Sequence, residues 1–200
     1  MTRLPNPATT RPLPASLSPA DPRPALSVVV PAYNEQEVLP AFHARLVPVM
    51  EKVGLPWDVV YVNDGSRDAT LAVMLGLQAA DPRAAVLNLS RNFGKEIALT
   101  AGLDHASASE AVIVIDADLQ DPPEVIPDLV TAWRAGGVDI AYAQRRAREG
   151  ETWLKKATAS GFYRFMQRVG GRVQLPRDTG DFRLMSRRSL DALLSMREQH

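Results

Sequence analysis

Two aspartates that directly follow an apolar run are the strongest chemical feature of this 200-residue sequence. Asp116 and Asp118 come after residues 111–115, which read AVIVI, and they are separated by Ala117. Two carboxylates held close together repel each other unless a proton or a cation lies between them. A hard divalent ion such as Mg²⁺ or Mn²⁺ takes oxygen ligands and leaves positions open for phosphate oxygens. The pair therefore predicts a site for Mg²⁺ or Mn²⁺ and a diphosphate, to which Gln120 could add its carbonyl oxygen.

Acidic residues also follow two other predicted strands. Glu35 comes after an apolar run at residues 26–31, and Asp64 comes after residues 57–63. Ligands of open α/β sheets bind beyond the carboxyl ends of the strands, where such residues would meet. Aspartate is also common in turns, which leaves a purely structural interpretation of each acid taken alone. Three acidic strand ends together favour a binding site.

Other ways of holding phosphate lack their signatures. The sequence contains neither a G-x-x-x-x-G-K-[ST] loop nor a G-x-G-x-x-G turn. A phosphate group would then be held by the metal and by basic side chains. Arg145 and Arg146 follow a predicted strand at residues 138–143 and could reach a diphosphate. Lys95, which follows Gly94 at a predicted helix start, could contact phosphate or simply be a solvated lysine.

These residues require a scaffold of alternating strands and helices. Short β-branched runs predict strands at residues 26–31, 57–63, 84–90, 110–116 and 138–143. Amphipathic stretches predict helices at residues 35–53, 66–80, 95–107 and 122–136, with a last helix from about residue 186. Strands and helices that alternate at this spacing form βαβ units. The sequence therefore predicts an α/β fold with a mainly parallel central sheet flanked by helices.

Local signals predict where two of the helices begin. Asn34 and Glu37 have the spacing of a capping box at the start of the first helix. Pro40 and Pro48 would kink or shorten that helix. Asp121 followed by Pro122 predicts an N-cap and a first helical residue for the helix at residues 122–136.

The composition is that of a soluble globular chain preceded by an extended leader. The hydrophobic fraction is 46%, and the absence of cysteine excludes disulfides and thiolate metal sites. No apolar stretch approaches the roughly 20 residues of a membrane-spanning helix. Residues 1–25 hold seven of the sixteen prolines and predict a disordered leader, which leaves residues 26–200 as the folded domain.

Positive charge is concentrated toward the C-terminus of a chain whose formal net charge is zero. Residues 145–188 contain twelve Lys or Arg and four Asp or Glu. A basic helix predicted at residues 151–169 carries aromatic residues, a mixture that suits a membrane surface. It suits an ordinary amphipathic helix packed on the sheet equally well. Nucleic-acid binding is disfavoured, because the net charge is zero and no binding motif occurs.

The motifs along the chain, taken in order, resemble those of family 2 glycosyltransferases. Within that family they are similar to the polyprenyl-phosphate type, which includes bactoprenol glucosyltransferases and dolichyl-phosphate mannose synthases. Each motif alone is short, but the series extends from about residue 26 to the end of the chain. The motifs are VVVPAYNE (28–35), VNDGSRD (62–68), SRNFGKE (90–96), DADLQDPPE (116–124), AQRR (143–146) and TGDFRLMSRR (179–188).

The resemblance implies a GT-A fold and a metal-dependent enzyme that transfers a hexose from a nucleotide sugar to a polyprenyl phosphate, with inversion at the anomeric carbon. UDP-glucose is the first choice of donor and GDP-mannose the second, because the segments at residues 150–156 and 179–188 look most like bactoprenol glucosyltransferases. The implied place of action is the inner, cytoplasmic face of the membrane. The sequence carries no signal for an oligomeric state.

The resemblance also implies roles for the residues at matching positions. The catalytic residues would be Asp181, Asp118 and Arg145, with Asp181 near the transferred sugar, although pairing with a neighbouring arginine would make it purely structural. The metal ligands would be Asp116, Asp118 and Gln120. The donor would be bound by Pro31, Ala32, Tyr33, Glu35, Asp64, Asp116, Ala117 and Arg183, and Asp64 would hydrogen-bond the base or ribose.

Two alternatives stay open. Relatives of this type commonly continue into interfacial and membrane-spanning helices, whereas this chain stops at His200, so it could bind nucleotide sugar without transferring it. Haloacid-dehalogenase-like phosphatases also place D-x-D after an apolar strand. They normally carry Thr or Val two residues after the second aspartate, however, where this sequence has Gln120. Hydrolysis of an aryl phosphate, compared with metal-dependent binding of UDP or GDP, separates the phosphatase from a transferase.

Overall fold

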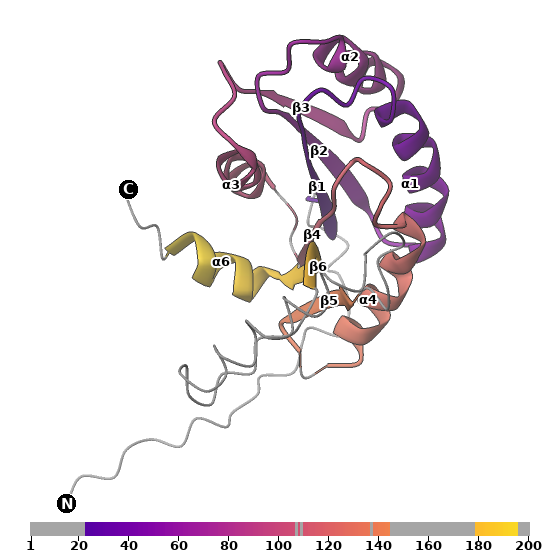
Figure 1. Cartoon of the computed structure of the whole chain (residues 1–200). Coiled ribbons are helices and arrows are strands. Elements are labelled where there is room, and N and C mark those ends of the chain that lie inside the picture. The colour runs from indigo at the N-terminus through magenta and orange to yellow at the C-terminus, as the bar shows by residue number, and fades with distance from the viewer. Residues whose placement is uncertain (1–22, 107, 109, 137, 145–178, 196–200) are drawn as a thin grey trace, which may run out of the picture. The chain divides into compact units, whose positions relative to one another are not determined.

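The computed structural model describes residues 23–106, 108, 110–136, 138–144 and 179–195 (Figure 1). The chain divides into two compact units, Met1–Tyr142 with Asp181–His200 and Ala143–Gly180. The site described below belongs to the first unit. Most of the predicted leader, Arg145, Arg146 and the predicted basic helix lie outside the described residues.

The elements follow the predicted alternation, with ends shifted by a few residues. Within the described ranges, no helix combines the length and apolar character needed to cross a bilayer. The strands are β1 (Leu26–Ala32), β2 (Trp57–Asn63), β3 (Ala84–Asn88), β4 (Ala111–Val114), β5 (Ile140–Gln144) and β6 (Thr179–Ser186). The helices are α1 (Leu39–Val53), α2 (Thr70–Ala80), α3 (Lys95–His105), the short 3₁₀ helix η1 (Pro123–Val125), α4 (Ile126–Arg134) and α6 (Arg187–Ser195).

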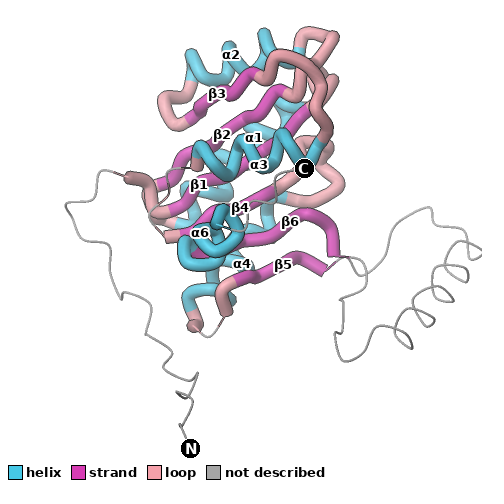
Figure 2. Tube along the Cα trace, turned by 90° about the vertical axis from the view of Figure 1, so that its left-hand side faces the viewer, coloured by secondary structure: helices cyan, strands magenta, loops and turns pink. Residues whose placement is uncertain are grey.

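The strands form one sheet in the order β3-β2-β1-β4-β6-β5 (Figure 2). β3, β2, β1 and β4 run parallel, whereas β6 runs antiparallel to β4 with Arg183 opposite Val114. The predicted mainly parallel sheet is therefore confirmed. β6 is missing from the predicted strands, although residues 181–184 alternate polar and apolar side chains with the period of a strand.

Helices cover both faces of this sheet, which explains why its central strands are apolar. α3 and α6 lie on one face and α1 and α4 on the other (Figure 1). All seven residues of β1 are buried between them. α3 packs tightly against the strands at Gly102, where an added Cβ would lie 2.4 Å from Val29 Cγ1. This close packing fixes the position of α3 on the sheet, and with it the place where the helix begins.

The predicted capping box at the start of α1 is wrong. The helix begins later, at Leu39, and Val38 precedes it without a side-chain cap. Asn34 instead has a positive φ of 58°, and its Oδ1 accepts a hydrogen bond of 2.9 Å from the Arg67 N–H. Pro40 therefore falls in the first turn, where a missing N–H breaks no helical hydrogen bond. Pro48 lies inside α1, and the helix nevertheless extends to Val53. The side chain expected to cap a helix joins two loops instead.

The predicted start of the helix at residue 122 is shifted by one position. Pro122 is extended, with φ −73° and ψ 123°, and Pro123 opens the short turn η1 that leads into α4. No side chain caps this turn, so the predicted N-cap role of Asp121 is wrong. Asp121 is instead a buried acid, with only 3% of its surface exposed.

Candidate active site

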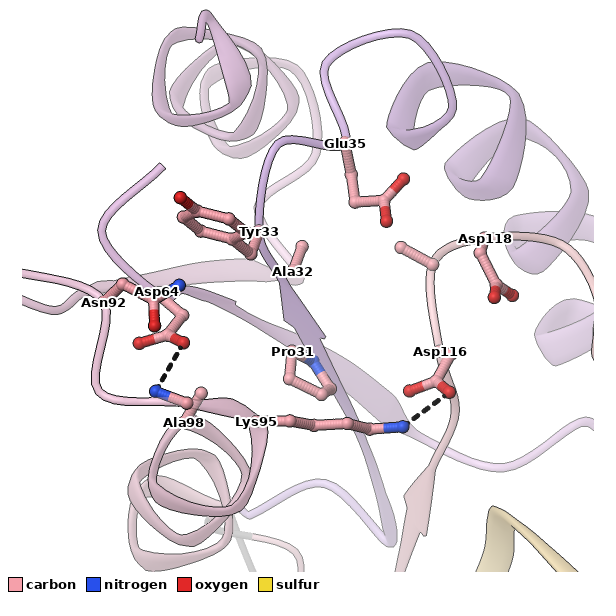
Figure 3. A pocket seen from close by; sticks show the side chains of 12 residues that line it. Pro31, Ala32, Tyr33, Glu35, Asp64, Asn92, Lys95, Ala98, Asp116 and Asp118 are labelled. Carbon is pink, nitrogen blue, oxygen red and sulfur yellow. Dashed lines mark hydrogen bonds and ion pairs between the residues drawn. The ribbon is translucent and has the colours of Figure 1, made fainter. Parts of the chain in front are cut away.

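A pocket opens where the strand order reverses. β2 pairs with one side of β1 and β4 pairs with the other, so the loops beyond their carboxyl ends diverge. The pocket between these loops has a volume of about 310 Å³, within the usual range for small-molecule sites (Figure 3). Its lining residues are Pro31, Ala32, Tyr33, Glu35, Asp64, Asn92, Gly94, Lys95, Ala98, Asp116, Ala117 and Asp118.

Most of the predicted site residues therefore share one cavity. The lining contains every predicted donor-binding residue except Arg183, and it contains two of the three predicted metal ligands. Gln120 is outside it, and Arg145 lies outside the described residues. Asn92, Gly94, Lys95 and Ala98 come from α3 and the loop before it, and of these the sequence suggested only Lys95, as a possible phosphate contact.

The loop after β1 is held in place by the loop after β2. The Asn34 N–H donates to Ser66 Oγ at 3.0 Å, and the Glu35 N–H donates to Thr70 Oγ1 at 2.8 Å. These bonds satisfy backbone donors that would otherwise need water. They fix the wall from which Tyr33, 37% exposed, presents its ring at the pocket (Figure 3). An exposed, rigidly held aromatic ring suits stacking on a nucleoside base.

Asp64, at the end of β2, holds the loop that precedes α3. Its Oδ1 accepts the Phe93 N–H at 2.7 Å and its Oδ2 accepts the Gly94 N–H at 2.9 Å. The side chain is almost fully buried, with 3% of the residue exposed. Both carboxylate oxygens are thus engaged by backbone, and the observed role of Asp64 is to position the start of α3. Its predicted contact with the base or ribose stays a prediction.

The loop after β4 presents the paired aspartates. Asp116 is partly buried and Asp118 is exposed, and the Gln120 N–H donates to Asp118 Oδ1 at 2.9 Å. Leu119 adopts a φ of 60°, a left-handed conformation that costs a non-glycine residue about 1–2 kcal/mol. Strained backbone of this kind persists only where its surroundings hold it, and it is frequent at ligand sites. The Gln120 carbonyl oxygen as a metal ligand stays a prediction.

Lys95, the first residue of α3, joins two acids from different strands. Its Nζ lies 2.7 Å from Asp116 Oδ2 and 2.6 Å from Asp181 Oδ2. Burial alone lowers the pKa of the ammonium, but hydrogen bonds and charge from both carboxylates raise it above its ordinary value. Figure 3 shows the side chain extended across the pocket from α3 to Asp116. Lys95 is therefore ion-paired rather than simply solvated, and its possible contact with phosphate stays a prediction.

β6 brings Asp181 and Arg183 to the same end of the sheet. β6 pairs with β4, although β4 ends at Val114 and β6 begins only at Thr179. Because of this pairing, Asp181 reaches the ammonium of Lys95. Arg183 lies two residues further along the same face of the strand. Its Nε is buried and makes no hydrogen bond within the described residues. Asp181 therefore pairs with Lys95 and not with the neighbouring arginine of the structural alternative.

The pocket holds more negative than positive charge. Burial raises the pKa of the Glu35 carboxyl, and the charges of Asp118, Asp68 and Asp116 raise it further. Lys95 is the basic residue among those lining the cavity. A carboxyl that resists ionisation because of neighbouring carboxylates marks a place where an added cation would be stabilised.

The donor atoms present fit a hard divalent ion. Asp116 and Asp118 supply carboxylate oxygens at the open side of the cavity, and the excess negative charge felt by Glu35 is what such an ion would neutralise. Within the part of the chain that the structure describes, no three His, Asp or Glu side chains gather closely enough to coordinate an ion alone. Ligand oxygens and water would therefore complete the coordination, as is usual for Mg²⁺.

The sequence matches a known family. A profile of glycosyl transferase family 2 matches residues 27–194. An uncharacterized glycosyltransferase of Synechocystis sp. is 48% identical over 174 residues, which are 87% of this chain and 54% of the relative. The bactoprenol glucosyl transferase of Shigella phage SfV is 42% identical over 175 residues, 88% of this chain and 56% of the relative. The chain thus spans about half the length of these curated relatives.

A solved structure shares the fold. The glucosyl-3-phosphoglycerate synthase of Mycobacterium tuberculosis, in complex with Mn²⁺, UDP and phosphoglyceric acid, matches with a TM-score of 0.60. The match covers 82% of this chain and 56% of that structure at 23% sequence identity. The predicted GT-A fold is confirmed by this likeness, which at such identity concerns the fold alone.

Proposed function

Because the chain belongs to glycosyl transferase family 2, we propose that it is the catalytic part of an enzyme that transfers a hexose from a nucleotide sugar to a polyprenyl phosphate. UDP-glucose is the donor of first choice and GDP-mannose the second. The relative named bactoprenol glucosyl transferase supports this class of sugar and acceptor. Since such an acceptor is a membrane lipid, we place the reaction at the inner face of the cytoplasmic membrane.

One observation carries this proposal: a single pocket joins the exposed ring of Tyr33 to the carboxylates of Asp116 and Asp118. The ring suits a base, and the acids suit a cation that binds a diphosphate. A nucleoside diphosphate sugar carries both groups on one molecule. The transferred sugar would extend from the diphosphate toward Asp181, which reaches Asp116 through Lys95.

The proposed reaction is a displacement at the anomeric carbon. An oxygen of the lipid phosphate forms a bond to that carbon while the bond to the nucleoside diphosphate breaks, and attack opposite the leaving group inverts the configuration. A phosphate monoester has a second pKa near 6, so the nucleophile is already ionised at neutral pH and needs no strong base. The difficult part is the negative charge that collects on the departing diphosphate.

We assign separate roles in this reaction to charged residues of the site. A divalent ion bound at Asp116 and Asp118 would supply the charge that stabilises the leaving diphosphate. Asp118 is preoriented for this role by the Gln120 N–H. We assign Asp181 to orienting a sugar hydroxyl or the acceptor phosphate, and Arg145, outside the described residues, to a second contact with the diphosphate.

Transfer of labelled glucose from UDP-glucose to a short polyprenyl phosphate tests the proposal. We expect label in the lipid fraction with Mn²⁺ or Mg²⁺, loss of transfer when EDTA removes the ion, and recovery when the ion is restored. Parallel reactions with GDP-mannose and with dTDP-glucose rank the donors, and arms with and without added membranes test whether a membrane surface is needed.

The alternatives predict different outcomes in the same assay. Metal-dependent binding of UDP-glucose without transfer in any arm would show a nucleotide-sugar-binding domain and contradict the proposed catalysis. Hydrolysis of an aryl phosphate in place of transfer would show a phosphatase. Transfer that persists undiminished in EDTA would contradict the proposed role of the ion.

A further inference from the structure

The ammonium of Lys95 occupies a position that two acids of the pocket share. Asp116 Oδ2 and Asp181 Oδ2 both lie within hydrogen-bond distance of the same Nζ, at 2.7 and 2.6 Å. One acid follows β4 and the other lies on β6, so without this cation two like charges from separate strands would face each other. The lysine therefore supplies the positive charge between these two acids.

The backbone of this lysine is anchored, whereas its side chain is partly exposed and held by its two ion pairs. The two residues before it donate their N–H groups to the buried carboxylate of Asp64, which fixes the start of α3. The side chain of Lys95 is 42% exposed, and the exposed fractions of Asp116 and Asp181 are 24% and 38%. The long, flexible side chain can move the ammonium away from one of its two carboxylate partners while the start of the helix stays fixed.

An ammonium on Asp116 and a divalent ion on the same carboxylate exclude each other in part. The ammonium occupies Asp116 Oδ2, one of the two oxygens that the ion could use, and two cations a few ångströms apart repel strongly in a partly buried site. Asp118 does not contact Lys95, so it stays available to the ion. Asp181 is not one of the predicted metal ligands, so it can keep the ammonium when Asp116 releases it.

On the premise of the proposed function, we propose that Lys95 is a positioning residue that holds Asp116 and Asp181 together in the metal-free pocket and yields Asp116 to the divalent ion while staying on Asp181. Binding of the ion then does two things at once. It prepares the diphosphate site, and it moves the lysine to the acid assigned to the sugar or acceptor.

The affinity for Mn²⁺ without any nucleotide tests this proposal independently of catalysis. Free Mn²⁺ is followed by electron paramagnetic resonance in the wild-type protein, in Lys95→Met and in Lys95→Arg. We expect Lys95→Met to bind Mn²⁺ about tenfold more tightly, since a competing cation is gone. Lys95→Arg, which keeps the positive charge, should stay near the wild type. Lys52→Met, at an exposed lysine near the end of α1, makes the same change of charge far from the pocket and should leave the affinity unchanged.

Thermal unfolding supplies the second measurement. Metal-free Lys95→Met should melt at a lower temperature than the wild type, and saturating Mn²⁺ should remove most of that difference. Equal or weaker Mn²⁺ binding by Lys95→Met overturns the role proposed for Lys95 while leaving the proposed transferase untouched. Absence of Mn²⁺ binding in both proteins, even with UDP present, overturns the metal-dependent function as well.

Discussion

Asp118→Ala is expected to lower the turnover of sugar transfer about a hundredfold or more, and at least as much as Asp181→Ala. On the proposed assignment, Asp118 would supply a carboxylate to the ion, and the ion would stabilise charge that develops only as the diphosphate leaves. Loss of that interaction therefore raises the barrier of the chemical step. Asp181 is assigned to a sugar hydroxyl or to an acceptor phosphate that is already ionised, so its loss should cost no more. Turnover at saturating Mn²⁺ and donor measures both variants.

Asp118→Ala is expected to leave the fold intact. Its side chain is exposed, and its hydrogen bond from the Gln120 N–H lies within a surface loop. Asp128→Ala is a suitable control, because Asp128 is an exposed acid in the first turn of α4, away from the pocket. It should retain full turnover and an unchanged melting temperature. Near-wild-type turnover of Asp118→Ala with metal present would disprove the role assigned to this residue.

Gly65→Ala is expected to lower the free energy of unfolding by about 2–4 kcal/mol and to weaken nucleotide binding. Gly65 has a φ of 62°, and an added Cβ would lie 2.2 Å from the carbonyl carbon of Arg91 and 2.4 Å from the Asn92 nitrogen. Neither backbone atom can move away without carrying the whole loop. Since Asp64 holds that loop by two hydrogen bonds, the clash also displaces the start of α3.

Gly54→Ala separates the clash from the cost of the backbone conformation. Gly54 has a similar φ of 71°, but no atom lies within 4 Å of the position of its Cβ. It should therefore show only the left-handed cost of about 1–2 kcal/mol. Urea unfolding of both variants, together with titration of UDP, provides the comparison. An equal loss of stability in the two variants would show that the contact with residues 91–92 is unimportant.

The arrangement of the pocket could be predicted in large part because it depends on strand ends. Apolar runs identified the strands, and the parallel sheet brings the residues after β1, β2 and β4 to a common edge. Acidic residues placed directly after such runs, such as Glu35, Asp64 and Asp116, were therefore expected to meet. The structure brings all three into the lining of one cavity.

The rest depended on contacts between segments that are remote in sequence. Nothing local to Asp64 indicates that its oxygens accept the N–H groups of Phe93 and Gly94, about thirty residues later. Likewise, a lysine after a glycine at a helix start gives no indication of two acid partners, one of them on β6. β6 itself could have been found from the alternation of residues 181–184, and its antiparallel pairing with β4 would then have placed Asp181 near Asp116.

A helix cap was mispredicted for a related reason. Asn34 has the side chain of a good N-cap, but tertiary contacts used it elsewhere, since its Oδ1 accepts the Arg67 N–H in the neighbouring loop. Local capping rules consider one segment at a time. In this molecule the loops after β1 and β2 form hydrogen bonds with each other, and α1 begins only after the first of these loops.

Location of the ion tests the central claim most directly. Crystals of the protein grown with UDP and Mn²⁺ are measured at the manganese absorption edge, where only the metal gives a strong anomalous signal. The account predicts one peak between the carboxylates of Asp116 and Asp118 and the two phosphates of UDP, with the Lys95 ammonium on Asp181. UDP bound in the pocket with no peak at these carboxylates, or with the metal elsewhere, would contradict it.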